Sequence, residues 1–128
     1  MAHARDYIYS TALSPASAHV ALKAVNLIKN GECRDRLAQV IEAFKLAAKA
    51  RGLRLLGSHT PIQPLVVGDI DKLAKVNREL KTAGFWVGAI RPPTVPQGSA
   101  RLRITLNVNH TQAELEALAD QLQRALQD

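Results

Sequence analysis

The sequence predicts an α+β fold, in which a mostly antiparallel sheet of three or four strands has helices packed on one face. The predicted elements run in the order helix, helix, strand, strand, helix, strand, strand, helix. Several connections between strands are shorter than the dozen or so residues that a parallel crossover needs. With 128 residues, 47% of them hydrophobic, one domain can bury a core without disulfides or a structural metal.

Two helices are predicted in the first half of the chain. Ser14, followed by a proline, favours a helix over residues 14–29, and its apolar residues do not keep to one face. We therefore expect this helix to need a neighbour and, without one, to promote self-association. From Glu32 to Gly52, apolar residues at helical spacing between charged ones predict an amphipathic second helix.

Two further helices are predicted from their caps. Asp69 is placed to cap a third helix that Gly84 ends in a left-handed conformation. Thr111 and Glu114 have the spacing of a capping box and begin the last helix, with His110 supporting the preceding turn.

Strands are expected at residues 53–56, 62–67, 85–90 and 102–106. Pro64 places the second of these toward a sheet edge, because proline cannot donate a ladder hydrogen bond. Trp86, in the third, is expected to be a core residue.

Composition argues against several functions. Cys33 is the only cysteine, which fits a reducing compartment and a cytoplasmic protein. No apolar run approaches the ~20 residues that span a bilayer, so we expect no membrane contact. The formal charge of +6 comes from scattered basic residues with few aromatics, which disfavours nucleic acid as a partner, although a non-enzymatic basic interaction domain stays as an alternative.

The segment from Ile90 to Arg103 is the most informative part of the chain. A loop with three prolines precedes a strand on which Arg101 and Arg103 alternate with apolar residues and share a face. A guanidinium suits a carboxylate because it donates two parallel hydrogen bonds and stays charged. The alternative is that both arginines only solvate an exposed strand face.

This segment resembles the signature of the α-oxoamine synthases, and RPPTVP at Arg91–Pro96 is most similar to the 8-amino-7-oxononanoate synthase branch. Three longer pieces resemble the same branch in order and spacing. They are YIYSTALSPA at Tyr7–Ala16, IQPLVVGD at Ile62–Asp69 and GFWVGAIRPPTVP at Gly84–Pro96.

The resemblance implies that residues 1–128 form the C-terminal small domain of a pyridoxal-phosphate enzyme of fold type I. The domain with the cofactor lysine would be absent, and the seven lysines of this chain match no such position. Arg103 would hold the carboxylate of the amino-acid substrate and Thr94 would contact substrate from the loop. Ser10 and Thr11 would reach the cofactor phosphate of the other subunit of a homodimer, or would only form a turn.

The resemblance also implies the reaction. The complete enzyme would condense L-alanine with pimeloyl-CoA or pimeloyl-acyl carrier protein in biotin biosynthesis, releasing carbon dioxide. These 128 residues alone would be inactive and would bind no cofactor. The alternative within the family is another α-oxoamine synthase, such as glycine C-acetyltransferase.

Overall fold

The computed structural model describes residue 12 and residues 14–127, which form two compact units, residues 1–34 and 35–128. The first unit contains α1 (Pro15–Lys29), which has no buried residue. The second contains most of α2 and all elements after it. They are α2 (Glu32–Ala50), β1 (Ile62–Gly68), α3 (Ile70–Thr82), β2 (Gly88–Ile90), β3 (Ala100–Thr105) and α4 (Gln112–Gln127).

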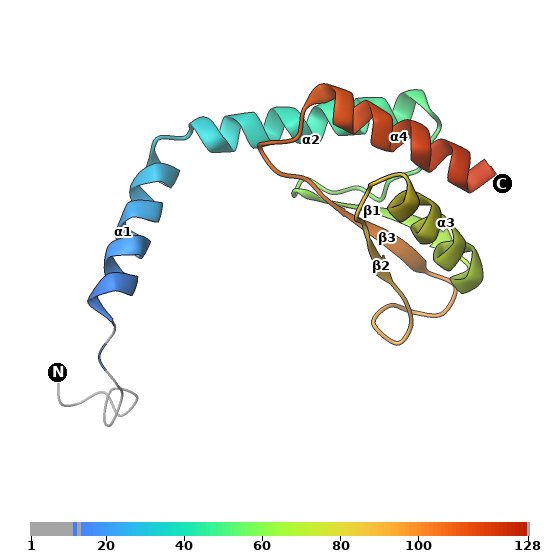
Figure 1. Cartoon of the computed structure of the whole chain (residues 1–128), viewed down its shortest axis with the longest axis horizontal. Coiled ribbons are helices and arrows are strands. Elements are labelled where there is room, and N and C mark those ends of the chain that lie inside the picture. The colour runs from blue at the N-terminus through green and yellow to red at the C-terminus, as the bar shows by residue number, and fades with distance from the viewer. Residues whose placement is uncertain (1–11, 13, 128) are drawn as a thin grey trace. The chain divides into compact units, whose positions relative to one another are not determined.

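The second unit is built on a three-stranded antiparallel sheet with the order β1-β3-β2. In its register Leu65 of β1 lies opposite Leu102 of β3, and Ala89 of β2 lies on the other side of Leu102. α3 contacts all three strands and α4 packs against α3 (Figure 1). The predicted α+β class, with an antiparallel sheet and helices against it, is confirmed.

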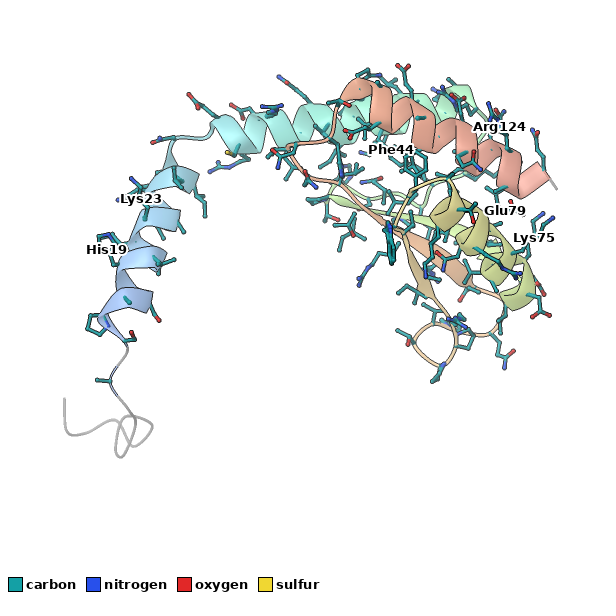
Figure 2. All side chains as sticks on the ribbon, in the orientation of Figure 1. His19, Lys23, Phe44, Lys75, Glu79 and Arg124 are labelled. Carbon is teal, nitrogen blue, oxygen red and sulfur yellow. The ribbon has the colours of Figure 1, made fainter. Side chains whose placement is uncertain are left out.

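One hydrophobic cluster joins the sheet to α2, α3 and α4. Phe44 of α2, which is fully buried, extends from its helix into this cluster (Figure 2). The sheet contributes Leu65, Leu102 and Ile104, all from the same face of β1 and β3. The end of α2 is also tied to α4, because Arg51 pairs with Asp120 and its carbonyl accepts from Gln123. The helices therefore cover one face of the sheet and leave the other free.

The caps formed as the sequence predicts. The Asp69 side chain accepts from the backbone N–H of Lys72 at 2.7 Å, and Gly84 leaves α3 with φ +89°. Thr111 and Glu114 form a reciprocal capping box at the start of α4. Ser14 precedes α1 without a side-chain capping bond.

Three strand predictions need correction. Residues 53–56 form no strand, and only Leu55 makes an isolated bridge, to Leu65. The strand expected at 85–90 is shortened to Gly88–Ile90, because only these residues pair with β3. Trp86 precedes the strand and is 85% exposed, so its expected place in the core was wrong. Alternating apolar residues predict an extended chain there, but they do not show where the ladder ends.

Candidate functional site

Two arginines of β3 lie on the sheet face opposite the helices. Burial alternates along β3, with Ala100, Leu102 and Ile104 buried and Arg101 and Arg103 partly or fully exposed. Because successive side chains of a strand point to opposite faces, both arginines face away from the hydrophobic cluster. We call Arg101, Arg103 and Thr105 the arginine face.

A glycine opposite Arg103 leaves room for its guanidinium group. Gly88 of β2 pairs directly with Arg103, and a β-carbon at Gly88 would lie 3.6 Å from the Arg103 Nε. The Arg103 side chain therefore lies across β2 at the position that a side chain of residue 88 would occupy. A glycine inside a strand often marks such a close approach, so this signal was present in the sequence, although the strand pairing was not.

Hydrogen bonds brace the loop of residues 91–99 that joins β2 to β3. The backbone N–H of Thr94 donates to the Arg91 carbonyl at 3.0 Å. The Ser99 hydroxyl donates to the Pro96 carbonyl at 2.6 Å, and Arg101 Nε donates to the Ser99 carbonyl at 3.0 Å. Arg101 is thereby tied to the loop, whereas no printed hydrogen bond holds Arg103. The two arginines thus have different roles, one structural and one available.

The arginine face carries positive charge without a protein counterion. The ion pairs among the described residues join Lys45 to Glu42, Arg51 to Asp120 and Lys75 to Glu79, the last along α3 (Figure 2). Within residues 14–127, neither Arg101 nor Arg103 meets a carboxylate. An arginine left free beside a braced loop can bind a carboxylate ligand through a bidentate pair.

The predicted site residues are only partly brought together. Arg103 and Thr94 are both exposed, on β3 and on the loop before it, and no hydrogen bond joins their side chains in the described structure. Ser10 and Thr11 lie outside the described residues. The sequence did not indicate the tether of Arg101 to Ser99 or the placement of Arg103 over Gly88.

The described residues fit a substrate carboxylate and not the cofactor that the resemblance implies. All seven lysines lie on helices, as the sequence predicts: Lys23 and Lys29 on α1, Lys45 and Lys49 on α2, and Lys72, Lys75 and Lys81 on α3. Lys72 Nζ donates to the Leu126 carbonyl, and Lys45 and Lys75 pair with glutamates. None lies on the arginine face, so we derive no cofactor step from these residues.

Two further searches of the described part of the chain found no site. No helix there has the length and hydropathy needed to cross a bilayer. Histidine, cysteine and acidic side chains do not gather there in threes as metal ligands would.

The fold and the arginine-bearing strand agree with the comparison to known proteins. The family described as "Aminotransferase class I and II" matches residues 1–122, and the chain belongs to this family. It is 46% identical over 126 residues to the 8-amino-7-oxononanoate synthase of Marinomonas sp. (strain MWYL1), covering 96% of this chain and 31% of that protein. The predicted resemblance to this branch is confirmed. The chain spans about a third of the length of the curated relatives it matches.

Solved structures share the fold. The crystal structure of 8-amino-7-oxononanoate synthase from Francisella tularensis superposes with a TM-score of 0.82 at 26% identity, over 98% of this chain and 37% of that one. A serine palmitoyltransferase from S. paucimobilis, with a bound PLP–myriocin aldimine, gives a TM-score of 0.78 at 28% identity, over 94% and 31%. Pyridoxal phosphate is thus bound by a protein of similar fold.

Proposed function

We propose that this chain is the substrate-binding C-terminal part of a pyridoxal-phosphate-dependent 8-amino-7-oxononanoate synthase. The complete protein condenses L-alanine with a pimeloyl thioester and releases carbon dioxide and the free carrier. The observation that carries the proposal is Arg103, an exposed guanidinium over Gly88 with no carboxylate partner among the described residues. The 46% identity to a curated 8-amino-7-oxononanoate synthase supports the choice of substrates.

Arg103 holds the alanine carboxylate in this proposal, and Thr94 contacts the substrate from the braced loop. A two-point guanidinium contact fixes the direction of the carboxylate and so the orientation of the α-carbon. When bound, pyridoxal phosphate supplies the electron sink for carbanion chemistry at that carbon. The role of this chain is to bind and orient the amino acid.

The complete protein has further features under this proposal. It is a cytoplasmic homodimer, in which Ser10 and Thr11 reach the cofactor phosphate of the other subunit. The cofactor lysine belongs to a part of the protein outside these 128 residues. Residues 1–128 alone are therefore inactive.

Coenzyme A release tests the proposal. The complete protein is given L-alanine with pimeloyl-CoA and, in a separate assay, glycine with acetyl-CoA, while residues 1–128 serve as the control. We expect release from the first pair only, and none from the control. Release from the control, or no release with either pimeloyl-CoA or pimeloyl-acyl carrier protein, contradicts the proposal.

A sister activity is the second candidate, because a serine palmitoyltransferase has the same fold at a TM-score of 0.78. In that case the arginine face would bind the carboxylate of another amino acid. Preferred use of glycine with acetyl-CoA, or of serine with a long-chain acyl-CoA, would identify this branch.

A further inference from the structure

A hollow of about 350 Å³ lies beside β3, where β2 has not yet begun. β2 pairs only with Arg101, Leu102 and Arg103, so residues 104–106 have no strand partner on that side. Residues 84–87 and the start of α4 line the opposite walls. The shortened β2 therefore creates the hollow, whose volume is within the range of about 300–1,000 Å³ that small-molecule sites occupy.

The walls of the hollow are largely apolar. Phe85, Val87, Ile104, Leu115 and Leu118 contribute to them. Such a lining favours a hydrocarbon chain, because transfer of each methylene group from water is favourable by about 0.8 kcal/mol.

Trp86 lines the same hollow and is 85% exposed. A tryptophan normally buries most of its large apolar surface, so this degree of exposure indicates a surface that a ligand can cover. Lys81 Nζ lies 5.4 Å from the centroid of the Trp86 ring. The rim therefore combines an aromatic surface with a cation that has no ion pair among the described residues.

The other polar groups of the hollow are already engaged. Glu114 accepts from the backbone N–H and the hydroxyl of Thr111 through one carboxylate oxygen, at 2.8 and 2.9 Å. Both ring nitrogens of His110 lie within hydrogen-bonding distance of Asn107. Lys81 is thus the ionic group left for a ligand, and a carboxylate is its natural partner.

The hollow adjoins the arginine face. Thr105 belongs to both, and it follows Arg103 by two residues, which span about 7 Å in a strand. A substrate held there lies close to the amino acid that Arg103 binds.

We propose that this hollow binds the acyl chain of the pimeloyl thioester, with its methylene groups on Trp86 and Phe85 and its distal carboxylate on Lys81. This inference rests on the proposed function, and it adds a residue that selects a dicarboxylic acyl chain over a monocarboxylic one. Lys81 discriminates because an acyl chain without the distal carboxylate offers it no counterion.

The test uses the 128-residue chain, in which Trp86 is the only tryptophan and reports on the hollow by its fluorescence. The ligands are the N-acetylcysteamine thioesters of pimelic and heptanoic acid, which have equal chain length and differ in the distal carboxylate. This small carrier removes the phosphates of coenzyme A, which the chain with its charge of +6 would attract nonspecifically. We expect saturable fluorescence changes and about tenfold tighter binding of the pimeloyl thioester.

Two matched variants test the role of the cation. Lys81→Gln should abolish the preference for the pimeloyl thioester while leaving heptanoyl binding unchanged. Lys75→Gln, on the same helix but paired with Glu79, should behave like the wild type. Both side chains are exposed or nearly so, and circular dichroism will verify that each variant is folded.

The inference is overturned by equal affinity for the two thioesters, by a preference that persists in Lys81→Gln, or by no response of Trp86 to either ligand. Failure here is separable from failure of the proposed function. If the complete protein releases coenzyme A from pimeloyl-CoA and alanine while Trp86 gives no response, the reaction is correct and this subsite is wrong.

Discussion

The availability of Arg103 depends on the residue opposite it. Gly88 has no side chain, so the guanidinium of Arg103 lies over the neighbouring strand and still reaches solvent. Arg101, two residues earlier, donates to the Ser99 carbonyl. Two arginines that are equivalent in sequence pattern therefore differ in the structure, and the difference makes Arg103 the carboxylate ligand.

Arg103→Ala in the complete protein should lower kcat/KM for alanine by about 10- to 100-fold, the value of a hydrogen bond to a charged group. The KM for the pimeloyl thioester should change little, because Arg103 contacts the other substrate. Steady-state kinetics with each substrate varied in turn measures both. Arg124→Ala, an exposed arginine of α4 (Figure 2), is the control. Normal alanine kinetics in Arg103→Ala would refute the assigned role.

Glu114 predicts how the stability of the domain changes in acid. Its carboxylate accepts from the backbone N–H and then from the hydroxyl of Thr111, and these bonds hold the pKa of Glu114 below its usual range. A depressed pKa adds stability that is complete above the unfolded value of about 4.3 and is lost as pH falls through the folded value. Stability should therefore decrease in acid partly through this group.

Glu114→Gln separates the charge from the capping bond, because glutamine also completes a capping box. Between about pH 5 and about pH 3, the variant should lose less thermal stability than the wild type does. Thermal unfolding followed by circular dichroism across this range measures the difference. Parallel losses in both proteins would show that the charge of Glu114 does not contribute.

At the scale of elements, α2 depends on one aromatic residue for its attachment to the sheet. Phe44 is fully buried in the cluster that α2 shares with α3, α4 and the strands, whereas Leu46 on the same helix is 67% exposed. Position on the helix, and not hydrophobicity alone, thus decides what each residue contributes.

Phe44→Ala should lower the free energy of unfolding by about 3–5 kcal/mol, the loss of a buried aromatic side chain plus the cavity it leaves. Leu46→Ala should change it by less than about 0.5 kcal/mol, since it removes little buried surface. Urea unfolding of the two variants and the wild type gives these values. Similar losses in both variants would show that Phe44 is not central to the packing.

At the scale of the whole molecule, the sequence predicted what depends on local pattern. The caps at Asp69 and Thr111 and the edge position of β1 are set by neighbouring residues, and they were correct. The exposed position of Trp86 was not predicted, because it depends on where the pairing of β2 with β3 stops. The arginine face was predicted from alternation, but the different environments of Arg101 and Arg103 required the strand register.

The first unit supports a last prediction, on association. α1 has no buried residue, and Val20, Leu22, Val25, Leu27 and Ile28 are between 47% and 68% exposed. An apolar surface of this kind favours contact with another copy of the chain, because association removes it from water. Sedimentation velocity of residues 1–128 should show a sedimentation coefficient that rises with concentration, and Leu22→Gln with Leu27→Gln should weaken this rise. A monomer at all concentrations would show that these side chains are tolerated in water.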